Sequence, residues 1–279
     1  MLLTPRYGHE PVLSVAIRAD GPHPLMSQRR RLEGLLADLS EAEWQHPSRC
    51  AGWSVQDVVT HLISTNGFWA LSIDAGVRGE PTELLAAFDP VASPAQLVER
   101  GQGTPVEETL EQLTASTAAL GEVIAGLADA DWERLAEAPP GHLPVHLVAD
   151  HALWDCWVHE RDIALPLGRP AVVDDDEVLT CLRYAAGLGR AFEVCGRRAE
   201  PGTVVLEVSD PAAVLVITTD ADGVRISDGS PPAGAVRGRG DAVALLEMLS
   251  TRDAGAPVPD AVTALTAGLA VVFDQTEPV

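Results

Sequence analysis

The chain has 279 residues, a hydrophobic fraction of 46% and a formal net charge of −22 at pH 7. Its length allows one large domain or two smaller ones, and its hydrophobic fraction excludes a disordered tail. Because a surface this acidic repels phosphate backbones, nucleic-acid binding is not expected.

We expect a cytoplasmic protein without a leader peptide or a membrane segment. Residues 1–24 contain four prolines and are predicted to form an extended arm, which lacks the apolar centre of a signal peptide. No stretch approaches the roughly 20 apolar residues that a membrane span needs. The cysteines form no CxxC pair and are expected to be reduced thiols. They are Cys50, Cys156, Cys181 and Cys195.

Four amphipathic segments follow the arm and predict a helical bundle. In each segment, apolar residues recur at intervals of three and four, as on one face of a helix. Ser54 followed by Asp57 is typical of a helix start. A stretch rich in Gly and Pro, 79–104, separates the second helix from the third. Because four helices fit into about 140 residues, we expect a four-helix bundle over 25–170. The predicted helices cover 25–39, 54–75, 106–127 and 144–165.

The pattern changes after Pro170, and residues 171–279 predict a smaller α+β domain. Short apolar runs bounded by Asp-Pro and Asp-Gly pairs are typical of strands joined by tight turns. The fold class predicted for the whole chain is therefore α+β, with an all-α bundle in front of a mixed unit. Helices are expected at 174–198, 241–249 and 259–273, and strands at 204–208, 213–218, 223–226 and 235–238.

Two of the predicted bundle helices carry residues that could bind a metal ion. Asp155 and His159 are four residues apart and therefore share one helix face. His61, near the edge of the apolar face of the second helix, is the best third ligand, because inward side chains of neighbouring bundle helices meet. Two imidazoles and one carboxylate suit zinc, nickel or iron and leave a coordination position open.

The spacing alone leaves other interpretations open. A histidine at the edge of a helical core is more often a satisfied core residue than a metal ligand. His151, four residues before Asp155, could replace His61 as the third ligand, or it could contact a ligand without binding the metal itself. The next residues along this helix, Glu160 and Arg161, are expected to form an ion pair with each other on the surface.

Two segments resemble signatures of a known family. Residues 50–62, CAGWSVQDVVTHL, resemble the N-terminal signature of the mycothiol-dependent maleylpyruvate isomerase family, one of the DinB-like metal-dependent helical bundles. Residues 157–163, WVHERDI, resemble its second signature. The resemblance implies metal ligands at His61, Asp155 and His159, on the second and fourth helices. The family's carboxylate is usually glutamate, so Asp155 is one methylene shorter and changes the reach of this ligand.

The resemblance also implies a reaction. A divalent metal, with zinc favoured, would activate mycothiol as a thiolate that attacks a small electrophilic substrate, in an isomerase or an S-transferase. Arg252 corresponds to an arginine that faces the cleft between the domains in this family and can hold a carboxylate. Two alternatives remain open, a thiol-independent metal hydrolase and a non-catalytic small-molecule-binding protein with a degenerate metal site. The sequence identifies neither the electrophile nor the oligomeric state.

Overall fold

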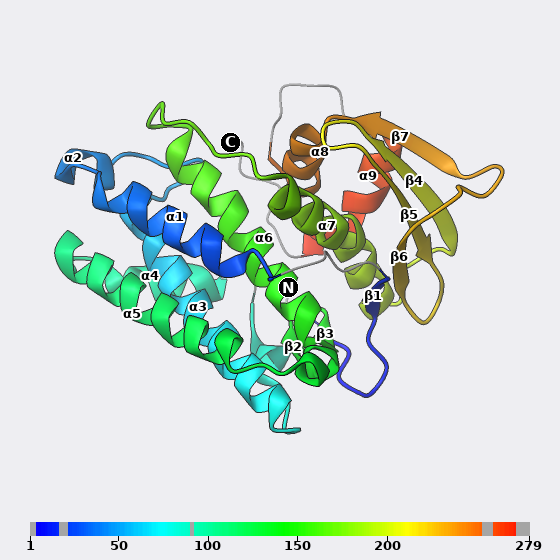
Figure 1. Cartoon of the computed structure of the whole chain (residues 1–279), viewed down its shortest axis with the longest axis horizontal. Helices are drawn as coiled ribbons and strands as arrows, with labels where there is room; N and C mark the ends of the chain where they lie inside the picture. The colour runs from blue at the N-terminus through cyan, green and yellow to red at the C-terminus, as the bar shows by residue number, and fades with distance from the viewer. Residues whose placement is uncertain (1–3, 17–21, 90–91, 253–258, 272–279) are drawn as a thin grey trace.

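The computed structural model places a helical part beside a part built on a mixed sheet (Figure 1). This arrangement confirms the predicted α+β class, with a helical bundle first and a sheet unit second. The structure describes residues 4–16, 22–89, 92–252 and 259–271.

Four long helices form the bundle where the sequence predicts them. Helix α3 contacts both α5 and α6, and α1 contacts the same two helices from the other side. Short helices occupy the connections: α2 (Glu41–Trp44), η1 (Leu84–Ala87), α4 (Ala92–Gly101) and η2 (Asp129–Glu133). The long helices are α1 (Leu25–Ala37), α3 (Val55–Val77), α5 (Val106–Ala125) and α6 (Val145–Ala164).

The start of α3 is fixed by a reciprocal cap. The Ser54 hydroxyl accepts a hydrogen bond from the Asp57 backbone N–H at 3.2 Å, and the Asp57 carboxylate accepts one from the Ser54 N–H at 2.9 Å. Two backbone donors that the helix leaves unsatisfied are thereby paired. This cap sets the register of the helix and puts His61 on its second turn.

A two-stranded hairpin precedes α6, between the helices predicted at 106–127 and 144–165, where the sequence analysis predicts no strand. Its strands are β2 (Leu135–Ala138) and β3 (Gly141–Pro144), which pair antiparallel. Glu137 is fully buried on β2 and accepts hydrogen bonds from the Tyr7 hydroxyl and the Thr82 hydroxyl. The carboxylate therefore ties the N-terminal arm and the segment after α3 to the hairpin.

The sheet of the second part has the order β1-β6-β5-β4-β7. Its three central strands pair antiparallel, and each edge strand pairs parallel to its neighbour. The edge strand β1 comes from the N-terminal arm, because Leu13 and Val15 bury their side chains against the second part. The strands are β1 (Leu13–Val15), β4 (Gly202–Val208), β5 (Ala213–Thr219), β6 (Val224–Asp228) and β7 (Val236–Gly240).

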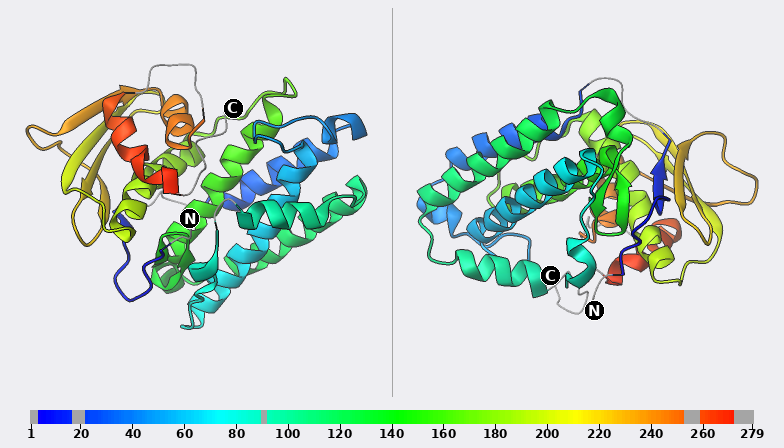
Figure 2. Two further views of the ribbon diagram at one scale, coloured as in Figure 1. Left: turned by 180° about the vertical axis from the view of Figure 1, so that it is seen from behind. Right: turned by 90° about the horizontal axis from the view of Figure 1, so that it is seen from below.

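Helix α7 (Asp175–Cys195) lies between the bundle and the sheet (Figure 2). It contacts α6 on one side and β1, β5 and β6 on the other. Gly189 permits a close approach of the C-terminal segment, since a Cβ there would lie 2.1 Å from the Leu265 carbonyl oxygen. The main hydrophobic core contains residues from both sides of the boundary expected near 170, and that boundary remains a prediction.

The remaining helices are short and pack near α7. They are α8 (Ala242–Leu249), α9 (Asp260–Thr266) and the 3-10 helix η3 (Ala267–Val271). The last two lie within the helix predicted at 259–273, whose final two residues fall outside the described residues.

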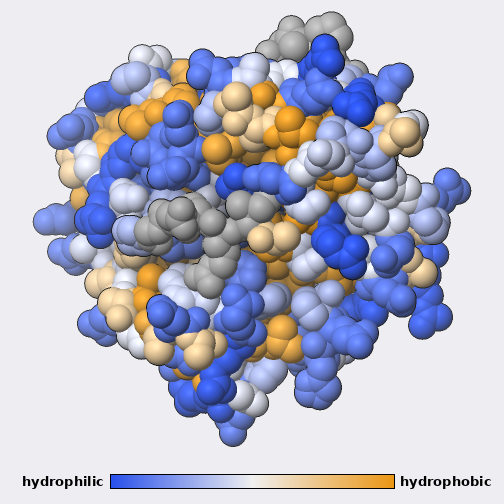
Figure 3. All heavy atoms as spheres, turned by 45° about the vertical axis from the view of Figure 1, so that its right-hand side comes forward, coloured by the Kyte–Doolittle hydropathy of each residue, from blue (hydrophilic) through white to orange (hydrophobic). Residues whose placement is uncertain are grey.

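The surface mixes hydrophilic and hydrophobic residues. On the face drawn in Figure 3, hydrophilic residues interrupt the hydrophobic areas, as is usual for folded domains. Within the described ranges, none of the helices combines the length and the apolar character that a membrane span requires.

Candidate metal centre

His61, Asp155 and His159 lie together where α3 faces α6. The Oδ1 atom of Asp155 is 3.7 Å from His61 Nε2 and 3.6 Å from His159 Nε2. The two imidazole rings meet edge to face, with centroids 5.0 Å apart. One ligand atom from each residue lies within 4.8 Å of the other two. The structure thus brings together the three residues expected from the sequence, and we call them the triad.

The environment of Asp155 suits a cation. Its Oδ2 atom is buried, and within the part of the chain that the structure describes it has no hydrogen-bond partner. Burial disfavours the carboxylate, but the adjacent imidazoles of His61 and His159 hold the pKa of Asp155 well below its usual range. Because buried polar oxygens are normally paired, the unpaired Oδ2 atom points to a missing partner. The two imidazoles and one carboxylate of the triad are a donor set that fits a divalent metal.

The far side of the His159 ring faces a second polar group. Its Nδ1 atom lies 3.1 Å from Asp162 Oδ2 and 3.6 Å from the Cys50 sulfur. Burial disfavours the imidazolium, but the neighbouring Cys50, Asp162 and Asp155 raise the pKa of His159 to about 10. Cys50 is absent from the predicted site, and its place at the start of the first signature was the only available clue.

Cys50, His159 and Asp162 form another convergent group, but its charges disfavour a metal ion. Their ligand atoms also lie within 4.8 Å of one another. However, Arg252 donates to both oxygens of Asp162, at 2.9 and 2.7 Å, and Arg49 lies 3.4 Å from Oδ1. Two guanidinium groups already neutralise this carboxylate and repel a further cation. The triad is therefore the better candidate for a metal site.

Arg252, the residue expected to anchor an anion, lies beside the triad just after α8. Its Nε and Nη2 atoms are engaged by Asp162, and Nη2 is also 3.8 Å from the Cys50 sulfur. Its Nη1 atom contacts the Ser250 carbonyl oxygen only at 3.5 Å. The guanidinium therefore connects the second part of the chain to the bundle, with one nitrogen weakly engaged.

His151 packs among aromatic rings next to the triad. Its Nδ1 atom is 2.6 Å from the Tyr184 hydroxyl, and its ring centroid is 4.7 Å from Trp69 and 5.3 Å from Trp154. Burial lowers the pKa of His151 to about 4, so the ring is neutral at neutral pH. Among the described residues, the convergent groups include His61 and not His151.

The expected surface pair between Glu160 and Arg161 is wrong. Successive helix residues point about 100° apart and cannot face each other. Glu160 is buried and forms an ion pair with Arg31 of α1 at 2.8 Å, whereas Arg161 binds Glu247 of α8. Glu160 thus joins α6 to α1, and Arg161 joins α6 to α8.

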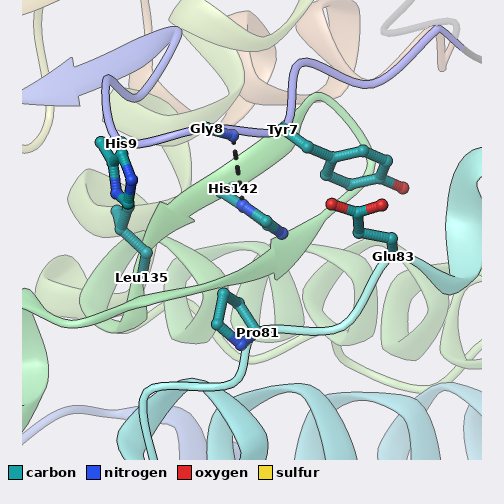
Figure 4. A pocket seen from close by; sticks show the side chains of 7 residues that line it. All are labelled: Tyr7, Gly8, His9, Pro81, Glu83, Leu135 and His142. Atoms are coloured by element: carbon teal, nitrogen blue, oxygen red, sulfur yellow. Dashed lines mark hydrogen bonds between the residues drawn. The ribbon is translucent and has the colours of Figure 1, made fainter.

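A pocket of about 280 Å³ lies away from the triad, between the N-terminal arm and the hairpin (Figure 4). The His142 ring beside it has partners at both nitrogens, since Nδ1 accepts from the Gly8 N–H and Nε2 lies 3.0 Å from the Thr82 carbonyl oxygen. This imidazole is therefore structural. The pocket is lined by Tyr7, Gly8, His9, Pro81, Glu83, Leu135 and His142.

Comparison with known proteins matches the helical part of the chain to a family. The model of the mycothiol maleylpyruvate isomerase N-terminal domain family matches residues 25–164, half of the chain and all of the triad. A search of curated proteins found no significant match.

Two solved structures resemble the fold over most of the chain. One is a mycothiol-dependent maleylpyruvate isomerase, and the other is its variant with a histidine replaced by alanine. Each covers 86% of this chain and 96% of its own, with a TM-score of 0.57. The identities are 16% and 15%, so this likeness concerns the fold.

Proposed function

This chain belongs to the mycothiol maleylpyruvate isomerase family, and from this premise we propose that it is a metal-dependent, mycothiol-dependent isomerase or S-transferase acting on a small electrophile. The observation that carries the proposal is the convergence of His61, Asp155 and His159, whose ligand atoms lie within 4.8 Å of one another. Three protein ligands rather than four are typical of a catalytic metal site.

The triad residues would hold the metal, with zinc favoured by two imidazoles and one carboxylate. When bound, zinc supplies Lewis acidity that lowers the pKa of a thiol and keeps it as a thiolate at neutral pH. Asp155 contributes one negative charge and an oxygen, Oδ2, that lacks a partner among the described residues. His61 and His159 come from different helices, so the bundle itself fixes the distance between them.

The proposed chemistry returns the thiol unchanged in an isomerisation. The thiolate forms a carbon–sulfur bond with an unsaturated carbon of the substrate, and the π electrons of its C=C bond move onto a conjugated carbonyl oxygen. Rotation about the resulting single bond and cleavage of the carbon–sulfur bond then restore the double bond and the thiolate. In an S-transferase, the carbon–sulfur bond persists and a proton is taken up.

Arg252 is the residue that we assign to an anionic group of the substrate. Its Nη1 atom is the nitrogen with the weakest contact, at 3.5 Å from the Ser250 carbonyl oxygen. A guanidinium binds carboxylates through directed N–H donors. The same side chain stays paired with Asp162, so substrate binding would use the outer edge of the guanidinium.

The implied partners are mycothiol and one small molecule, and a cytoplasmic location remains a prediction. Within the described residues, all four cysteines are free thiols, as expected from the sequence. Cys156 is fully buried, and burial raises its pKa to about 12, so it is unsuited to act as the nucleophile.

A thiol-dependence assay tests this function. Zinc-loaded protein should isomerise maleylpyruvate when reduced mycothiol is present, and the rate should fall to background with mycothiol disulfide, the matched control that lacks a free thiol. A thioether product that accumulates would identify an S-transferase. Hydrolysis of a substrate that proceeds equally without thiol would support a metal hydrolase instead. A chain that binds neither zinc nor thiol would be a non-catalytic binding protein.

A further inference from the structure

The orientation of the His159 ring has an identifiable cause, the Asp162 carboxylate one turn further along α6. We propose that Asp162 is a positioning residue, which holds His159 so that Nε2 faces Asp155 and is available to the metal. This inference rests on the proposed function, because it concerns the metal that the triad would hold. It adds to the three ligands a fourth residue that does not touch the metal.

The hydrogen bond between the two side chains decides which ring nitrogen faces the triad. Asp162 is fully buried, and both its oxygens pair with the Arg252 guanidinium, as expected of an ionised carboxylate. An ionised carboxylate can only accept hydrogen bonds. His159 Nδ1, 3.1 Å from Oδ2, therefore donates its N–H to Asp162, and Nε2, on the other side of the ring, faces Asp155, where a metal would take the place of the Nε2 proton.

The carboxylate itself is held from three directions. Arg252 follows α8, Arg49 lies in the loop before α3, and Cys50 is its neighbour in that loop. The Arg49 Nε atom lies 3.4 Å from Oδ1, and the Cys50 S–H donates to Oδ2 at 3.2 Å. Because these contacts leave Asp162 little freedom to rotate, the ring of His159 is fixed before a metal arrives.

The other imidazole of the triad has no equivalent support. His61 Nε2 lies 3.7 Å from Asp155 Oδ1, but among the described residues no second carboxylate pairs with the other side of this ring, which packs against Trp53 with centroids 5.5 Å apart. Asp57, one turn earlier on α3, uses its carboxylate to cap the helix at Ser54. The two histidines therefore differ in how their rings are held, because Asp162 fixes the orientation of the His159 ring and no corresponding carboxylate fixes that of His61.

Carboxylates that bind the second nitrogen of a ligating histidine generally strengthen metal affinity. Asp162→Asn keeps the size of the side chain but removes the charge, so it should weaken zinc binding about 10–100-fold. The measurement is competition with a chelator, at one pH, on the full chain. As a second readout, the visible spectrum of the fully cobalt-loaded variant should differ from that of the wild type, which a loss of stability alone would not cause.

Two single variants serve as matched controls. Cys50→Ser replaces the S–H donor to Asp162 Oδ2 with an O–H donor, so it preserves the hold on the carboxylate and should keep the zinc affinity within about threefold of wild type. Asp57→Asn removes the charge at the start of α3 but keeps a side-chain oxygen for the Ser54 N–H, so it should lower stability while His61 stays in place and the zinc affinity is unchanged.

A double variant guards against misfolding caused by an unpaired buried guanidinium. Asp162→Asn combined with Arg252→Met is compared with Arg252→Met alone, and the same fall of at least about tenfold in zinc affinity is expected. Equal affinities in these two proteins, or wild-type affinity in Asp162→Asn, would overturn the role of Asp162. Failure of the wild type to bind zinc would overturn the proposed function instead.

Discussion

Replacing His159 with alanine should abolish both zinc binding and turnover while the helical circular dichroism stays unchanged. The side chain would supply one of the three proposed ligands, so its loss would leave only His61 and Asp155, which are too few for a stable site. After reconstitution and dialysis, elemental analysis should find less than about 0.1 equivalent of zinc per chain, against about one for the wild type.

The matched control is His151→Ala, eight residues earlier on the same face of α6. His151 is also buried, but it bonds Tyr184 and is not one of the convergent ligands. This variant should retain about one equivalent of zinc, although its stability will fall because of the cavity. Stoichiometric zinc in folded His159→Ala protein would show that His159 is not a ligand.

Replacing Arg31 with methionine should cost about 3–5 kcal/mol of unfolding free energy, because it leaves two buried carboxylates without their cation. Arg31 of α1 binds Glu160 of α6 and Glu177 of α7 through four hydrogen bonds of 2.7–2.8 Å. The two glutamate side chains are only 6% and 2% exposed. Urea unfolding of the metal-free proteins, followed by circular dichroism, measures the loss.

The neighbouring Arg30 provides the control, because it is exposed on the same helix and Arg30→Met should change stability by less than about 0.5 kcal/mol. Adding Glu160→Gln and Glu177→Gln to Arg31→Met should restore most of the loss. If Arg31→Met lowers the unfolding free energy no more than Arg30→Met does, the role of the Arg31 ion pairs is contradicted.

The loss in Arg31→Met should also depend on pH. Burial already raises the pKa of Glu177 above its ordinary value of 4.5, and removal of the cation raises it further. A carboxyl group whose pKa is raised in the folded protein is protonated in both the folded and the unfolded protein at low pH, where it does not affect stability. As the pH rises through the raised pKa, the group destabilises the folded protein. The difference in unfolding free energy between Arg31→Met and the wild type should therefore grow from about pH 4 to pH 7.

The bundle and the convergence of the three triad residues could be predicted because their signals are local. Apolar periodicity defines the long helices, Ser54 and Asp57 define the start of α3, and the four-residue spacing of Asp155 and His159 places both on one face. The resemblance of two signatures indicated the family, which the family model confirms. The metal itself, the role of Arg252 and the domain boundary remain predictions.

The surroundings of the site could not be predicted because their contacts are distant in sequence. Asp162 and Arg252 are 90 residues apart, and Arg31 is 129 residues from Glu160. No spacing pattern within one helix encodes such pairs. The same limit explains the wrong pairing of Glu160 with its neighbour, and it explains why strand β1, far from its partner β6, was expected only as an extended arm.

X-ray absorption at the zinc edge of the reconstituted protein tests the central claim most directly. Coordination by His61, Asp155 and His159 predicts a shell of nitrogen and oxygen atoms at about 2.0–2.2 Å, with the outer scattering of two imidazoles, when no thiol is added. A sulfur atom at about 2.3 Å in thiol-free protein would place the metal on Cys50 instead and would contradict the triad as the metal site.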